Sequence, residues 1–165
     1  MNIQEEQYSR TAIIGQPFPE ITSKSLAGDV VSLPKIAEGK ATFICIAFVR
    51  SAQSMLESWV QPFEREFGKD SRFAFYEIPM LNSAWVVRSW IIDSGMRSGI
   101  PVEKHGSVVT YYGDYSGYQE ALGMVDTNLA YVFLLDKNGI VRWRGQGYAD
   151  PETEKEFIET LKALI

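Results

Sequence analysis

The longest apolar stretch of the chain is Ala41–Val49, and a pattern of helical period follows it. Its length and its content of Ile, Val and Phe predict a strand that is covered on both faces, at the centre of an α/β sheet. In residues 51–67, apolar side chains recur at helical spacing and glutamates lie on the opposite side. This pattern predicts a helix packed on the strand, capped by Ser51 or Ser54 and kinked by Pro62.

Shorter apolar segments predict the rest of the sheet. Residues 72–79 alternate enough to form a second strand, parallel to the first through a right-handed crossover. An Asn-Gly pair, typical of a tight hairpin turn, separates residues 129–136 from Ile140–Arg144. We expect these two segments to be antiparallel strands, the second of them at a sheet edge. Asp150-Pro151 then supplies a cap and a proline suited to the start of a last helix.

The beginning of the chain is predicted to lie outside the domain. Residues 1–14 are mostly polar, so we expect a flexible N-terminal arm there. Residues 15–165 fit a single domain, because the chain has only 165 residues. Near the start of this domain, Gly28-Asp29 suits a hairpin turn between two short strands within residues 24–33.

Two segments allow more than one interpretation. A helix from Asn82 to about Met96 is expected either between the sheet and the following segment, or with Trp85 or Trp90 at a partner surface. Residues 100–123 show no regular period. They predict a loop packed by its own aromatic side chains, with partner recognition as the alternative. This loop holds four closely spaced tyrosines: Tyr111, Tyr112, Tyr115 and Tyr118.

The composition narrows the classes of site. A formal net charge of -5 argues against an electrostatic nucleic-acid surface, which needs clustered Lys and Arg. One cysteine and one histidine are too few for a disulfide framework or a Cys/His zinc site, and no phosphate-binding or metalloprotease motif occurs. No apolar run reaches the roughly 18 residues of a membrane span. We therefore predict no cofactor, no metal, no nucleic-acid partner and no direct membrane span.

The order of the predicted elements is that of thioredoxin-like proteins, with a redoxin-type N-terminal hairpin and a central mixed sheet flanked by helices. Such proteins carry a reactive cysteine in the turn before the first helix, where free amides and the helix dipole stabilise a thiolate. Here the turn Arg50–Ser54 has no cysteine, and Cys45 lies within the central strand, where we expect a buried core side chain. Ala130 stands where the superfamily has a cis-proline, so its peptide bond is expected to be trans. Both features argue against a thiol enzyme.

A set of short motifs is spread over residues 40–165. They are Ser58-Trp59, Pro62-Phe63, Ile100-Pro101, Lys104-His105, Ala130–Asp136, Ile140–Trp143, Gly145 and Gly147. In their order and spacing they resemble the assembly factors for the membrane sector of the mitochondrial F-type ATP synthase. The resemblance implies a thioredoxin-like protein without a redox pair, associated during assembly with the proton-conducting a subunit. The alternative is a thioredoxin- or peroxiredoxin-like redox protein of bacterial type, degenerate or with an activity that these motifs do not reveal.

The resemblance also implies a protein partner, including a membrane-protein subunit, and a place on the matrix side of the inner mitochondrial membrane. Without it, we expect a cytoplasmic protein, because the N-terminus lacks a secretory signal or a transit peptide; a removed presequence is the alternative. The oligomeric state stays open.

The partner is expected to bind where the superfamily binds substrate: the turn at Arg50, the start of the first helix, and the loop before Ala130. His105 has no nearby nucleophile to serve, so we expect its segment to fold over this end rather than to catalyse. The candidate partner-binding residues are Arg50, Ser51, Gln53, His105, Tyr111, Tyr112 and Trp143.

Overall fold

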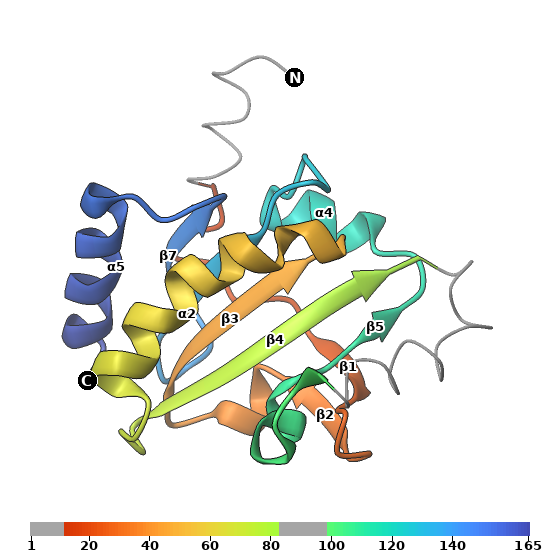
Figure 1. The fold of residues 1–165 in the computed structure, drawn as a ribbon, viewed down its shortest axis with the longest axis horizontal. Coiled ribbons are helices and arrows are strands. Elements are labelled where there is room, and N and C mark those ends of the chain that lie inside the picture. Colours follow the sequence, from red (N-terminus) through yellow and green to blue (C-terminus); the bar gives the residue numbers. More distant parts are fainter. Residues whose placement is uncertain (1–11, 83–98) are drawn as a thin grey trace.

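The computed structural model describes residues 12–82 and 99–165. Within these residues, five strands form a mixed sheet in the order β5-β4-β3-β6-β7, and two more form a separate hairpin (Figure 1). The predicted helix after Asn82, with Trp85 and Trp90, lies outside the described residues. The strands are β1 (Ile21–Lys24), β2 (Val30–Leu33), β3 (Ala41–Ala47), β4 (Phe73–Leu81), β5 (Tyr111–Tyr112), β6 (Tyr131–Leu135) and β7 (Val141–Gln146). The helices are η1 (Lys35–Ala37), η2 (Arg50–Ala52), α2 (Gln53–Phe67), η4 (Val102–Ser107), α4 (Ser116–Leu122) and α5 (Pro151–Ala163).

The strand β3 is central, as its apolar sequence predicts. It pairs in parallel with β4 and antiparallel with β6, while β7 continues the sheet to its edge. Residues 41–46 are all buried, because the strand has a neighbouring strand on each side and a layer of packed residues on each face of the sheet. The antiparallel pairing of β6 with β7 confirms the hairpin predicted from the Asn-Gly pair.

Side chains of β3 alternate between two cores. Phe43 faces α2 and α5, where its ring lies 5.0 Å from the rings of both Phe63 and Phe157. Ile44 and Ile46 face the opposite side, which the β1–β2 hairpin and the segment before it cover. In Figure 1, α2 crosses the sheet above β3 and β4, so the central strand is sandwiched between two layers.

The start of α2 differs from its prediction. A 3-10 turn, η2, runs directly into the helix, and neither Ser51 nor Ser54 caps it, since Ala52 occupies the cap position without a side-chain bond. The Ser54 hydroxyl instead lies 2.7 Å from the hydroxyl of Tyr148. Because η2 already supplies carbonyls to the first helical amides, a serine cap is not needed there. Pro62 does lie inside α2, as predicted.

The segment predicted to be a tyrosine-rich loop contains regular structure. Tyr111 and Tyr112 form β5, which pairs in parallel with the end of β4, and residues 116–122 form the short helix α4. A strand of two residues is too short to show a period of two in the sequence. The aromatic packing itself is present, because the rings of Tyr111 and Tyr118 lie 5.2 Å apart.

Both ends of the described domain are fixed by backbone contacts. Ile13 is buried, and the Gly15 amide donates to the Val141 carbonyl at 2.7 Å, which joins the N-terminal segment to β7. At the other end, Asp150 accepts a hydrogen bond from the Thr153 amide in a capping box that begins α5, as its Asp-Pro sequence predicts. The division into an arm at residues 1–14 and one domain stays a prediction.

Candidate functional site

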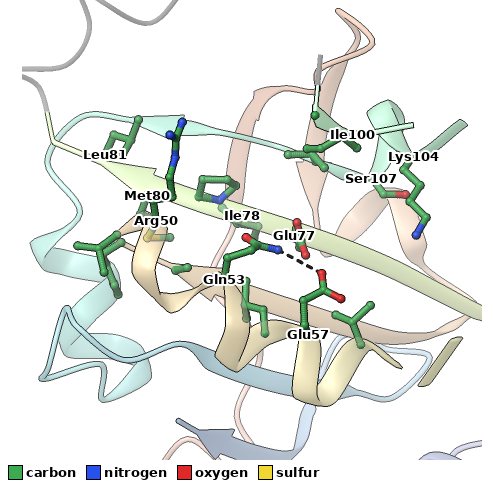
Figure 2. A pocket seen from close by; sticks show the side chains of 18 of the residues that line it. Arg50, Gln53, Glu57, Glu77, Ile78, Met80, Leu81, Ile100, Lys104 and Ser107 are labelled. Atoms are coloured by element: carbon green, nitrogen blue, oxygen red, sulfur yellow. Dashed lines mark hydrogen bonds between the residues drawn. The ribbon is translucent and has the colours of Figure 1, made fainter. Parts of the chain in front are cut away.

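A groove of about 880 Å³ lies between α2 and the adjoining face of β4. Its walls come from the end of β3 and the residues after it, from η2, α2 and β4, and from residues 99–108. Tyr115, just before α4, and Thr127, in the loop before β6, complete it. Figure 2 shows α2 on one side and the segment of Ile100 and Lys104 on the other. The groove therefore lies at the end of the fold where the sequence predicts partner binding.

Most side chains that line the groove are apolar, but its centre is acidic. Glu77 projects from the middle of β4 on the same face as Phe75, opposite Glu57 of α2. The Gln53 side chain donates a hydrogen bond to the Glu57 carboxylate at 3.4 Å. Figure 2 shows these three polar side chains directed toward one another.

The electrostatics of this centre oppose a charged Glu77. Burial raises the pKa of the Glu77 carboxyl, the Gln53 hydrogen bond lowers it, and the negative charge of Glu57 raises it further, for a net rise. Lys104 is too strongly engaged elsewhere to cancel this, because its ammonium group lies 2.7 Å from Glu64. A half-buried acid without a salt bridge costs stability when it ionises, and Glu77 has none within the described residues.

We therefore expect Glu77→Gln to raise the thermal midpoint at pH 7. A carboxyl whose pKa is higher in the folded state contributes stability below its unfolded pKa and loses that contribution as pH rises through its folded pKa. The gain from the substitution should accordingly shrink as pH falls toward 4.5, the ordinary pKa of a glutamate carboxyl. Thermal unfolding followed by circular dichroism at pH 7 and pH 4.5 measures both effects.

The control for this prediction is Glu66→Gln. This substitution removes the same charge as Glu77→Gln. Glu66 lies on α2 outside the groove, and its carboxylate is 3.9 Å from the ammonium group of Lys162. It is expected to change the midpoint little at either pH, because exposed ion pairs contribute little. A midpoint for Glu77→Gln that equals or falls below that of the unchanged protein at pH 7 would show that the charged carboxylate is well accommodated.

The predicted partner-binding residues divide between the groove and other places. Arg50 and Gln53 line it, whereas Ser51 is exposed beside it. The His105 ring is half-buried, with Nε2 2.9 Å from the Ile100 carbonyl oxygen, and its neighbour Lys104 lines the groove instead. The segment of His105 thus forms one wall of the groove.

Three other candidates lie away from the groove. Tyr111 packs on Tyr118, and Tyr112 is its neighbour on the edge strand β5. The Trp143 ring lies 5.3 Å from Trp59 and 5.4 Å from Phe157, where β7, α2 and α5 meet. The structure therefore does not bring these three residues to the site that holds Arg50 and Gln53. Their role in binding stays a prediction.

Sequence reasoning did not find the acidic centre. Glu77 interrupts an otherwise apolar strand, and this interruption was the available signal. Glu57 was expected only on the exposed side of its helix. Their approach depends on the parallel pairing of β3 with β4, which sets Glu77 next to Cys45 beneath α2. Distances of this kind do not follow from sequence spacing.

The turn before α2, where the superfamily carries its reactive thiol, holds no cysteine. Cys45 is fully buried, and burial is the largest cause of the raised pKa of its thiol. The Gln53 amide donates to the Arg50 carbonyl, so this amide is not available to an anion.

The peptide bond before Ala130 is trans, as predicted. No three carboxylate, His or Cys side chains within the described residues converge on a possible metal site.

Solved structures with this arrangement of strands and helices are thioredoxin-like. The thioredoxin domain of a thiol-disulfide oxidoreductase from Bacteroides vulgatus matches with a TM-score of 0.62 and 17% identity, over 92% of this chain and 98% of that chain. The exposed lipoprotein thioredoxin Etrx1 from Streptococcus pneumoniae matches with a TM-score of 0.59 and 13% identity, over 88% and 100%. The chain is thus an α/β protein of thioredoxin-like fold.

The family follows from the sequence comparison. The family described as ATP10 protein matches residues 15–164, and the chain therefore belongs to it. This confirms the resemblance to the ATP synthase assembly factors seen in the short motifs. The comparison with individual curated proteins finds no match. Within residues 12–82 and 99–165, no helix has the length and apolar content to cross a membrane.

Proposed function

We propose that this protein is a non-catalytic assembly factor that binds the a subunit of the F-type ATP synthase while the membrane sector is built. Membership of the ATP10 family over residues 15–164 is the observation that carries the proposal. The single cysteine supports a role without thiol chemistry, since it is buried in β3 and the turn before α2 has none. The expected location is the matrix side of the inner mitochondrial membrane.

The test is affinity capture. Tagged protein is incubated with detergent-solubilised inner mitochondrial membranes, and the a subunit is quantified by mass spectrometry against a thioredoxin domain as control bait. The a subunit is expected to be enriched at least tenfold. Enrichment of other membrane-sector subunits without the a subunit would redirect the proposal to another partner, and no enrichment of any ATP synthase subunit would contradict an assembly role.

The proposed partner surface is tested with folded variants. Arg50→Glu, His105→Ala and Tyr112→Ala change three candidate residues on η2, η4 and β5. Lys69→Glu is the control, because Lys69 is exposed just beyond the opposite end of α2. Circular dichroism confirms folding before each capture. We expect reduced capture by at least one of the three variants, and equal capture by all four would place the interface elsewhere, with β7 as the next surface to test.

The competing function is thiol-disulfide exchange, which the structural neighbours suggest by their fold. We expect Cys45→Ala to leave capture intact and to lower the free energy of unfolding by about 1 kcal/mol, as for a small core truncation. The native thiol is expected to resist a small alkylating reagent until the protein unfolds, because Cys45 has no exposed surface. Rapid labelling of the folded protein, or reduction of insulin disulfides by it, would favour the redox function.

A further inference from the structure

The groove beside α2 combines an apolar lining with an unbalanced acidic centre. Val60 of α2, Phe75 of β4 and Ile100 on the facing segment are among its apolar walls. Glu57 and Glu77 stand between them, and neither takes part in a salt bridge within the described residues. An apolar groove with two facing carboxylates is complementary to an apolar surface that carries positive charge.

Among the described residues that line the groove, the basic side chains of Arg50 and Lys104 do not balance its acidic centre. Lys104 is paired with Glu64, farther along α2 toward its end. Arg50 belongs to η2, before the first residue of the helix. The raised pKa of the Glu77 carboxyl agrees with this arrangement, because the neighbouring Glu57 is one of its causes and the attraction of Lys104 is a smaller one.

We propose that the groove receives an apolar polypeptide segment of a partner, and that one arginine or lysine of this segment binds between Glu57 and Glu77. This rests on the proposed protein-binding function and adds the chemistry of the bound segment to it. The apolar walls would bury the flanking side chains, and the basic group would convert a costly pair of carboxylates into a hydrogen-bonded ion pair. A segment without a basic side chain would bury the two carboxylates unpaired, so it would be excluded from the groove.

A bare metal ion fits these observations less well. Within residues 12–82 and 99–165, no group of three acidic, His or Cys side chains is close enough to hold a metal. The cavity of about 880 Å³ also far exceeds the space of an ion, and its walls are mainly apolar. A basic side chain needs only the two carboxylates, with apolar neighbours on either side of it.

A pair of synthetic peptides tests the inference without any ATP synthase subunit. Both are labelled Leu-Ala segments of 14 residues with solubilising glycines and serines at their ends. One carries a central arginine and the other carries norleucine at the same position. Binding to the full chain is measured by fluorescence anisotropy at 50 mM and 300 mM salt. The arginine peptide is expected to bind at least tenfold more tightly, with a smaller advantage at high salt.

Variants assign the advantage to the two carboxylates. Glu57→Gln combined with Glu77→Gln should remove the tenfold preference, and Glu66→Gln should keep it, because Glu66 lies on the same helix outside the groove. Equal binding of the two peptides, binding of neither, or a preference that survives the double substitution would overturn the inference. The a-subunit capture described above would still succeed in each of these cases if the protein is an assembly factor, so the two proposals fail separately.

Discussion

Replacing Trp59 by alanine is expected to lower the free energy of unfolding by about 3–5 kcal/mol, as for other large-to-small changes of buried aromatics. The Trp59 side chain is 1% exposed and lies edge-on to the rings of Trp143 and Phe157, both at 5.3 Å from its own ring. Its indole nitrogen donates to the Gly147 carbonyl at 2.8 Å. Alanine would leave a cavity between α2, β7 and α5 and an unpaired carbonyl beside it.

The conservative variant Trp59→Phe separates packing from the hydrogen bond. It keeps an aromatic ring in the cluster but leaves the Gly147 carbonyl without its donor, so we expect a smaller loss of about 1–3 kcal/mol. Urea unfolding followed by circular dichroism measures both variants, because a change of tryptophan content alters fluorescence. A loss below 1 kcal/mol for Trp59→Ala would mean that the three-element cluster repacks around the vacancy.

Much of the fold could be predicted because its longest elements have strong patterns. The sequence of β3 is apolar apart from Thr42, and the glutamates of α2 all avoid the side that meets Phe43. Asn138 and Gly139 allowed the β6–β7 hairpin to be predicted, because a tight turn needs a positive φ and Gly139 adopts one of 76°. Elements with these local signals were predicted, together with the central place of β3 and the edge place of β7.

Elements that depend on tertiary contacts could not be predicted. The strand β5 has two residues, and it exists because Tyr111 and Tyr112 reach the end of β4. The predicted serine cap of α2 is absent for a related reason. The 3-10 turn η2 occupies the residues directly before the helix, where a capping serine would have to lie. In both cases a neighbouring segment, rather than the local sequence, decides the conformation.

The sequence predicted that Arg50 and Gln53 lie together at this end of the sheet, but not the acidic centre of the groove that they line. Arg50 and Gln53 line the groove because they follow the carboxyl end of β3, where sites in open α/β sheets lie. Trp143, another candidate, packs on Trp59 and does not line the groove. The meeting of Glu57 with Glu77 needs both the strand register and the helix rotation. A single sequence gives neither to the accuracy of a hydrogen bond.

Arg144 links the edge strand β7 to the end of the helix α4. Its Nε donates to the Leu122 carbonyl at 3.1 Å and its Nη2 to the Gly123 carbonyl at 2.6 Å, at the end of α4. The guanidinium carbon also lies 5.2 Å from the centre of the Tyr131 ring. A cation at a helix C-terminus is favoured by the helix dipole, and a half-buried one is screened little.

Arg144→Met is therefore expected to lower the free energy of unfolding by about 2–4 kcal/mol, because two carbonyls would lose charged hydrogen bonds. Arg142→Met is the matched control on the same strand. Arg142 is exposed and pairs with Asp136 at 2.8 Å, so its loss should cost less than about 1 kcal/mol. Hydrogen exchange of the α4 amides should accelerate in the Arg144 variant alone. Equal costs for the two substitutions, with α4 exchange unchanged, would show that contacts other than Arg144 anchor this helix.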